Sequence, residues 1–265
     1  MEQREIDFIG QELYRETQER KKNGFWTKND LEMEQNLYKE LNALGFNFYW
    51  HMQLSPSCFT KKDTAIVPIF LKYYGKFNKD GLNQICIYCL GVKGLTKPLD
   101  FLISEVYRLN PPRNRDERQL LSSLYNAIYR IRDPKHIDDY IKIIMNKEML
   151  SDCHESLLIV DLIGKLKIKK AIPYLVDLMN SSFSEYKRNI CTGIDREEIT
   201  EGYLPPEYYI KYHGIHCIRA LTRYKNPDLI KYIKPYVTDE DVEIRKAAIK
   251  SIEKLESISV IKNKK

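Results

Sequence analysis

The sequence predicts an all-α protein, folded as a right-handed α-α superhelix of about five to six helical hairpins. Three observations support this prediction. Apolar residues recur at spacings of three and four along most of the chain, as in amphipathic helices. Glycine and proline are scarce, with 11 of each in 265 residues, which disfavours a strand-rich fold with many tight turns. One apolar column also aligns through five successive segments, which is the signature of a repeat architecture.

Composition and charge are those of a soluble globular protein, with 43% apolar and 30% charged residues. No run of 18 uncharged apolar residues occurs, and the charged N-terminus is unlike a signal peptide, so we expect a cytoplasmic protein with no membrane partner. Six irregularly spaced cysteines in such a chain predict reduced thiols. The net charge of +6 is compatible with an acidic protein partner or with nucleic acid.

Residues 1–62 are predicted to form an N-terminal helical cap with an irregular connector. Ile6, Ile9 and Leu13 give residues 2–22 one apolar helical stripe. A second helix is expected from Asn29 until Gly45 stops it. Residues 45–62 then mix aromatic residues with a Ser-Pro-Ser turn signal and follow neither a helical nor a strand period, so they predict an irregular segment.

Residues 63–257 are predicted to hold the repeat array, beginning with a helix at 63–77 that tolerates Pro68 near its start. The aligned column has intervals of 38, 35, 58 and 31 residues, and three of these are close to a helical-hairpin period. Its members are Leu90, Ile128, Ile163, Leu221 and Ile252. Nine positions further on, second helices are expected around Leu99, Ile137, Ile172 and Ile230. Prolines near the starts of these helices fit, because an N-terminal turn needs no proline N–H; they are Pro98, Pro134, Pro173 and Pro227.

The long interval of 58 residues contains a tyrosine-rich insertion at 181–212. It is longer than the usual connection between packed helices, and such segments commonly carry function. Tyrosines are enriched at interfaces, so this segment is a candidate partner-binding site, although its tyrosines could instead cover neighbouring helices. The candidate contacts are Tyr203, Tyr208 and Tyr209, with Tyr186 and Tyr212 beside them. Residues 258–265 form a basic tail.

The array resembles the HEAT-repeat family, in which a helix with proline near its start precedes a helix of the type Asp-x-x-x-Val/Ile-Arg-x-x-Ala. The match is closest at Glu240 to Leu255, where Ile244-Arg245-Lys246-Ala247-Ala248 follows that pattern. Earlier repeats depart from it, since Ser156 and Gly214 stand in the place of Arg245. The resemblance implies a solenoid in which the helices of the Asp-x-x-x-Val/Ile-Arg-x-x-Ala type, which carry the aligned apolar column, line a concave face, but it gives no shared role to that arginine.

Two positions beyond the apolar column, four repeats carry a cation near the end of the same helix. We call this set the basic ladder: Arg130, Lys165, Arg223 and Lys254, with Val92 in the first repeat. On a concave face the basic ladder would follow an acidic peptide or phosphates. Cations also favour helix C-termini for reasons of the helix dipole alone. A second column is Tyr88, Asn126, Asp161, Arg219 and Lys250, which gives each repeat a distinct contact or is ordinary variation on a solvated surface.

Catalytic, metal and cofactor sites are not predicted. The chain has no phosphate-binding glycine loop, His-Glu-x-x-His or Gly-x-Ser-x-Gly motif, and no motif points to a small-molecule substrate. Cys86 and Cys89 lack a second pair for zinc, and Cys86 shares a core column with Cys217. His216 falls at a core position of the register, so we expect a partly buried histidine with its hydrogen bonds satisfied.

These observations predict a non-enzymatic scaffold or adaptor that binds a macromolecular partner, a protein in the favoured interpretation. The alternative is a nucleic-acid-binding protein that uses the basic ladder. DNA glycosylases built from HEAT-like repeats are an enzymatic variant of that alternative, and their resemblance would imply a cleft lined by tryptophan. Trp26 and Trp50 both precede the array, which disfavours this reading.

Overall fold

The computed structural model describes most of the chain, and the described part is helical, with no strand among its residues. The described residues are 15, 19, 22, 26–48, 53–78, 80–146, 149, 156–191 and 206–262. The chain divides into two compact units, Met1–Glu105 with Arg115–Ile131 and Val106–Asn114 with Arg132–Lys265. The expected boundary at residue 62 therefore falls inside the first unit. None of the helices in the described ranges is long and apolar enough to cross a membrane.

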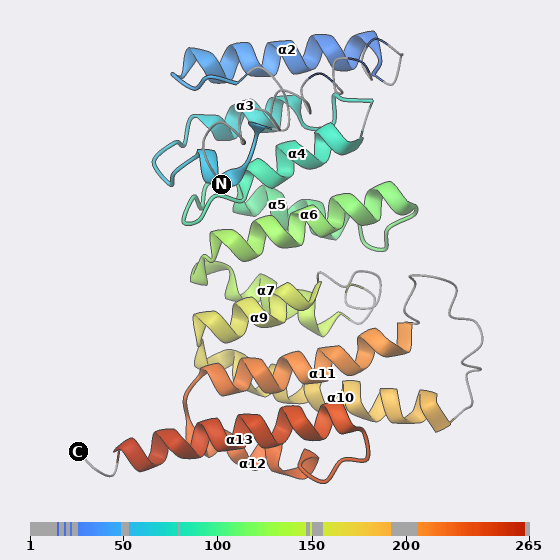
Figure 1. The fold of residues 1–265 in the computed structure, drawn as a ribbon, viewed down its shortest axis with the longest axis vertical. Helices are drawn as coiled ribbons and strands as arrows, with labels where there is room; N and C mark the ends of the chain where they lie inside the picture. Colours follow the sequence, from blue (N-terminus) through green and yellow to red (C-terminus); the bar gives the residue numbers. More distant parts are fainter. Residues whose placement is uncertain are drawn as a thin grey trace. The chain divides into compact units, whose positions relative to one another are not determined.

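The first unit consists of helices packed in chain order (Figure 1). They are α2 (Lys28–Ala43), α3 (Ile66–Tyr73), α4 (Asp80–Leu90) and α6 (Arg115–Ile131), and α5 (Leu99–Arg108) begins in this unit. Helix α2 packs on α3, α3 on α4, and α4 on α6. The predicted helix at 2–22 falls almost entirely outside the described residues.

Local chemistry sets the ends of the early helices. Helix α2 begins after Thr27, whose side chain and that of Asp30 cap each other's backbone N–H groups. Gly45 follows the helix with a φ of 94°, which glycine adopts without steric cost. The connector is irregular as predicted over 46–48 and 53–62, apart from short 3₁₀ turns such as Pro56–Cys58. Helix α3 begins at Ile66, three residues after the start that was predicted for it. The connector residues Phe46, Phe48 and Phe59 pack together, and Phe59 also contacts Phe70 of α3.

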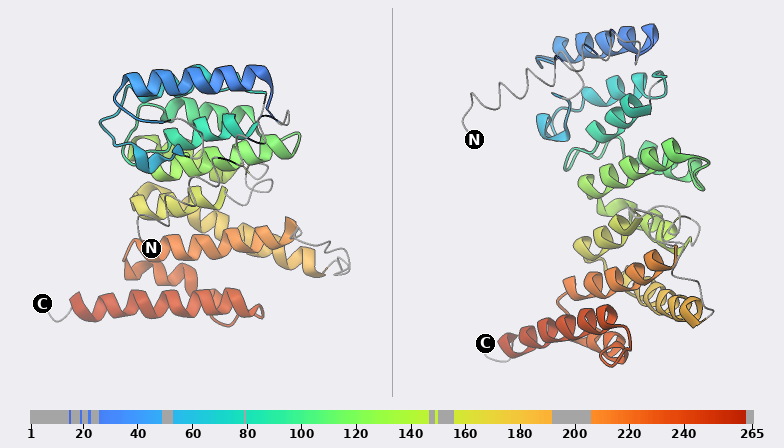
Figure 2. Two further views of the ribbon diagram at one scale, coloured as in Figure 1. Left: turned by 45° about the horizontal axis from the view of Figure 1, so that its top comes forward. Right: turned by 45° about the vertical axis from the view of Figure 1, so that its right-hand side comes forward.

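The second unit places its helices in two layers, which the views of Figures 1 and 2 show. The first layer contains α9 (Leu157–Leu166), α11 (Pro206–Arg223) and α13 (Val242–Lys262). The second contains α7 (Ile137–Met145), α10 (Ile172–Cys191) and the short α12 (Ile230–Ile233). Helix α11 packs on α9, α10 and α13, so it is the centre of this unit.

The repeat register predicted from the sequence is visible in the local structure. The four second helices begin at the aligned residues themselves, Leu99, Ile137, Ile172 and Ile230. Each preceding turn contains one residue with positive φ, four positions beyond the apolar column; these residues are Gly94, Arg132, Lys167 and Lys225. The prolines at 134 and 227 open 3₁₀ turns capped by Asp133 and Asn226. The same turn geometry therefore recurs at each of these four places.

Close helix packing follows the same register. In the first unit, a Cβ added at Gly91 would lie 2.8 Å from the Cα of Ala127. In the second unit, a Cβ added at Gly164 would lie 2.7 Å from the Cα of Ala220. Each glycine directly follows a member of the apolar column, Leu90 or Ile163. Each alanine directly precedes the next member of that column, Ile128 or Leu221. Small residues at these positions let neighbouring first-layer helices approach closely.

The tyrosine-rich insertion differs from the prediction. Residues 181–191 complete helix α10 and residues 206–212 begin α11, so most of the described insertion is helix. Tyr186 is buried and donates a hydrogen bond to Asp241 at 2.7 Å, so this tyrosine covers a neighbouring helix. Tyr203 lies outside the described residues, as do the side chains of Tyr208 and Tyr209. Residues 258–262 of the expected tail continue helix α13.

Candidate functional site

Two members of the basic ladder are used in contacts inside the protein. In the second unit, Nη1 of Arg223 donates to the Asp161 carboxylate at 3.1 Å and to the Asp161 carbonyl oxygen at 2.9 Å. In the first unit, Nη1 of Arg130 donates to the hydroxyl of Tyr88 at 3.0 Å, and its guanidinium lies over that ring. Lys165 is half-buried. Arg130 and Arg223 therefore have partners inside the protein, and the role of the basic ladder in partner binding stays a prediction.

The two arginine contacts are equivalent in the repeat register. In both, the ladder arginine contacts the preceding helix of the aligned series. The residue that it contacts stands two positions before the member of the apolar column on that helix, Leu90 or Ile163. Tyr88 and Asp161 offer, respectively, an aromatic face with a hydroxyl and a carboxylate, and each of these attracts a guanidinium. At these two places a residue of the second column thus accepts the ladder arginine, and the contact ties two neighbouring helices together.

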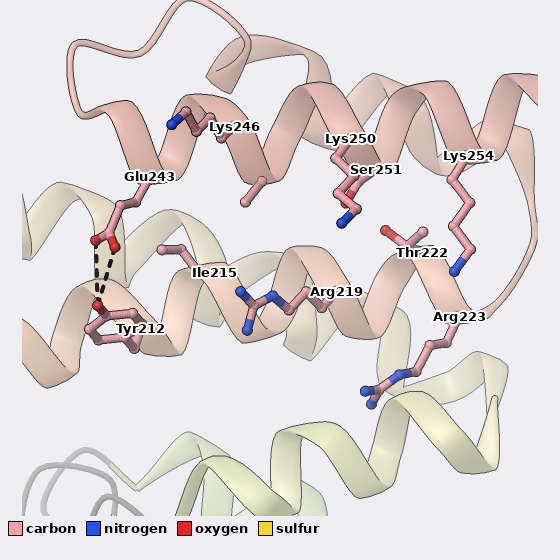
Figure 3. A pocket seen from close by; sticks show the side chains of 11 residues that line it. Tyr212, Ile215, Arg219, Thr222, Arg223, Glu243, Lys246, Lys250, Ser251 and Lys254 are labelled. Atoms are coloured by element: carbon pink, nitrogen blue, oxygen red, sulfur yellow. Dashed lines mark hydrogen bonds between the residues drawn. The ribbon is translucent and has the colours of Figure 1, made fainter.

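This pairing breaks between α11 and α13. The next ladder residue is Lys254, and the receptor position on α11 is Arg219, so two cations stand where a cation and its acceptor stand elsewhere. Figure 3 shows Lys250 and Lys254 extending from α13 toward α11, while the guanidinium of Arg223 points toward α9. Arg219, Lys246, Lys250 and Lys254 form no side-chain hydrogen bond or ion pair with any other described residue. These four side chains line one cavity between α11 and α13, which we call the cationic groove.

The cationic groove has a volume of about 550 Å³ and mixes charge with apolar and hydroxyl surface. Ile215 and Ala247 line it beside Thr222 and Ser251, and Arg223 and Tyr212 complete its α11 side. Its lining contains one acid, Glu243, which pairs with Lys211 at 2.5 Å. The lining of the groove therefore carries an excess of positive charge.

A buried ion-pair network holds the N-terminal end of α13 against α10 and α11. Lys211 is 4% exposed and contacts the carboxylates of Asp241 and Glu243. Burial acts to lower the pKa of Lys211, but the hydrogen bond to Glu243 and the charge of Asp241 outweigh it and raise that pKa. Asp241 also caps α13 by accepting from the N–H groups of Glu243 and Ile244. This network fixes one wall of the cationic groove.

Asp161 is the equivalent anchor between α9 and α11. Its carboxylate accepts from Arg223 and lies 3.2 Å from Nδ1 of His216. Burial acts to raise the pKa of Asp161, but the hydrogen bond and charge of His216 and the charge of Arg223 overcome it and lower that pKa. His216 is half-buried with a hydrogen-bond partner, which confirms the prediction for this residue.

Three of the described cysteines belong to the core. Cys86, Cys89 and Cys217 are fully buried, as the column assignment of Cys86 and Cys217 predicted. Burial raises the pKa of the Cys86 thiol to about 12, so it is a poor nucleophile and a poor metal ligand at neutral pH. Among the described residues, no group of three His, Cys, Asp or Glu side chains has the arrangement of a metal site.

Sequence reasoning found Arg223 and Lys254 of the cationic groove and gave no definite role to its other cations. Lys254 was a predicted contact and lines the groove, whereas Arg219 and Lys250 were assigned to a column of unsettled role. Lys246 was not singled out at all. A signal was present, because Lys246, Lys250 and Lys254 follow one another at intervals of four and so share one face of a helix.

The site and fold define a helical protein with a positively charged groove, and comparisons with known proteins add little to this description. No family model matches the chain, and no curated protein matches its sequence. Among solved structures the chain is similar to one described as an engineered protein. That likeness has 12% sequence identity and a TM-score of 0.39, and it covers 78% of this chain and 88% of the engineered one.

Proposed function

We propose that this protein is a non-enzymatic HEAT-like helical-repeat adaptor that holds an acidic segment of a partner protein in the cationic groove. The observation that carries the proposal is the break in pairing between α11 and α13. Arg130 meets Tyr88, and Arg223 meets Asp161. For Lys254 the equivalent position holds a cation, Arg219, and two further lysines line the same groove. Repulsion among these cations is relieved when an anionic partner binds.

The mixed lining of the groove favours a peptide over a nucleic-acid backbone. Ile215 and Ala247 offer apolar contact between the cations, and Thr222 and Ser251 are small and polar. An acidic peptide can place carboxylates on the lysines and apolar side chains between them, whereas a phosphate backbone uses only the charge. The wall held by Lys211 and Asp241 is preformed, which lowers the cost of ordering on binding.

The first test is affinity capture with the wild-type chain and with a Lys250→Glu/Lys254→Glu variant. Both lysines are exposed, so the reversal leaves the core unchanged. We expect the wild type to enrich a protein with an acidic segment and the variant to lose it. Lys231→Glu/Lys234→Glu is the matched control, because it reverses the same amount of charge at two exposed lysines of α12 and of the 3₁₀ turn Lys234–Tyr236, outside the groove, and it should retain the partner. Equal capture by the wild type and the double variant would refute the proposal.

A second measurement separates the protein partner from nucleic acid. A labelled oligothymidylate is titrated with the wild type at two salt concentrations. Phosphate binding by several cations would give an affinity that falls steeply with salt, with a slope that grows with the number of phosphates neutralised. We expect no shift at the higher salt. A strong shift that the Lys250→Glu/Lys254→Glu variant abolishes would replace the protein partner with nucleic acid.

A further inference from the structure

A second cavity of the same unit lies at the turns that follow α9 and α11, and it is independent of the cationic groove. Its volume is about 400 Å³. It is lined by Lys167, Lys169, Ile172, Tyr224, Lys225 and Asn226. Lys167 and Lys225 occupy the same position of the repeat register, four residues beyond the apolar column. The recurrence of one turn in successive repeats is therefore what brings two lysines to one cavity.

The walls of this cavity are tied together. The hydroxyl of Tyr224 donates to the carbonyl oxygen of Ile168 at 2.9 Å, which joins the turn after α11 to the turn after α9. Asn226 caps the next 3₁₀ turn, because its Oδ1 accepts from the N–H of Asp228 at 3.2 Å. That hydrogen bond leaves the Nδ2 donors of Asn226 without a partner among the described residues.

The charge in the cavity is not neutralised from within. No acid lines it, and the ammonium groups of Lys167, Lys169 and Lys225 form no ion pair with any residue that the structure describes. The neighbouring Lys170 behaves differently, since it lies 2.5 Å from the carboxylate of Asp138. Unpaired cations thus gather at the cavity, while the lysine beside it has an acidic partner.

We propose that this turn cavity binds a phosphoryl group. Three ammonium groups and an amide donor suit an anion with two charges and at least three acceptor oxygens better than a single carboxylate. Lysine binds phosphate as a point charge and needs no bidentate geometry, which fits side chains that rise from two turns. The phosphoryl group is carried by a free polyphosphate or by a phosphorylated segment of the partner.

The test is calorimetric titration of the full chain with sodium pyrophosphate at low ionic strength. The variant is Lys167→Asn/Lys225→Asn, because asparagine tolerates the positive φ of these positions. At about 0.2–1 kcal/mol for each exposed ion pair, loss of two cations weakens binding by about 2- to 30-fold. The control Lys142→Asn/Lys170→Asn removes the same charge from lysines that lie near Asp139 and Asp138, and it should bind as the wild type does.

Two results would overturn the proposal: absence of pyrophosphate binding by the wild type, or equal weakening by both double variants. The Lys250→Glu/Lys254→Glu variant should still bind pyrophosphate, so failure here is distinguishable from failure of the cationic groove. A phosphoserine peptide should compete with pyrophosphate and its unphosphorylated twin should not, and competition by both would show that the cavity does not select phosphate. Tighter binding of pyrophosphate would identify a free polyphosphate as the ligand, and tighter binding of the phosphoserine peptide would identify a phosphorylated segment.

Discussion

The close approach of α9 and α11 at Gly164 gives the sharpest test of the packing. A methyl group at this position would lie 2.7 Å from both the Cα and the Cβ of Ala220. The Cα belongs to the backbone and cannot rotate away, so Gly164→Ala must push the two helices apart. The Arg223–Asp161 contact spans the same two helices, and it would lengthen with them.

The magnitude follows from two opposing terms. Overpacking of a well-packed interface costs about 1–3 kcal/mol, and a backbone obstacle places this site toward the upper end. Alanine is favoured over glycine within a helix by about 0.8–1 kcal/mol, which offsets part of that cost. We therefore expect Gly164→Ala to lower the free energy of unfolding by about 2 kcal/mol, or the Tm by about 4–8 °C.

The assay is urea and thermal unfolding of three variants followed by circular dichroism. Gly91→Ala is the register equivalent in the first unit, and it should also destabilise, because its Cβ would meet Ala127. Gly81→Ala is the control, since a Cβ there meets nothing within 4 Å, and it should be neutral or stabilising by up to about 1 kcal/mol. If Gly164→Ala were as stable as Gly81→Ala, the inferred close packing of the first-layer helices would be incorrect.

Two further predictions concern the ion pairs of the second unit. Lys211→Met should lower the free energy of unfolding in urea by about 2–4 kcal/mol, because it leaves the partly buried carboxylate of Asp241 without its cation. A decrease of less than about 0.5 kcal/mol would show that the ion-pair network is not needed for stability. Because the folded pKa values of Asp161 and Asp241 are lowered, their stabilisation is present above the unfolded pKa of about 4 and is lost as pH falls through the folded values. The free energy of unfolding of Asp161→Asn should therefore decrease less than that of the wild type when the pH falls from 7 to 3. Equal decreases in the two proteins would contradict a stabilising role for the Asp161 carboxylate.

The start of each second helix was predictable because it depends on local chemistry. Apolar residues at intervals of three and four mark the buried face of a helix, and proline is tolerated at a helix start. The second helices accordingly begin at the aligned residues Leu99, Ile137, Ile172 and Ile230. Cys86, Cys217 and His216 were also placed correctly, because burial follows from the same period.

The insertion at 181–212 shows where that reasoning stopped. Its polar and aromatic residues obscure the apolar period, so the sequence suggested a long connection. The structure extends α10 and α11 into it, because Tyr186 and Lys211 find partners on the turn before α13 and in its first turn, at Asp241 and Glu243. These contacts join residues 30 or more positions apart, and a periodic pattern within one helix carries no record of them.

The sequence by itself determined an all-helical chain, the starts of the helices Leu99–Arg108, Ile137–Met145, Ile172–Cys191 and Ile230–Ile233, and most of the buried apolar column, because each of these follows from the spacing of residues along one helix or turn. Only the tertiary structure decided which cations are free. Arg223 and Lys254 hold equivalent positions, yet Arg223 meets Asp161 on a neighbouring helix, whereas the corresponding position on the neighbour of Lys254 holds another cation, Arg219. Whether a charge is neutralised depends on the side chain that stands across the interface, and that side chain is contributed by a different repeat.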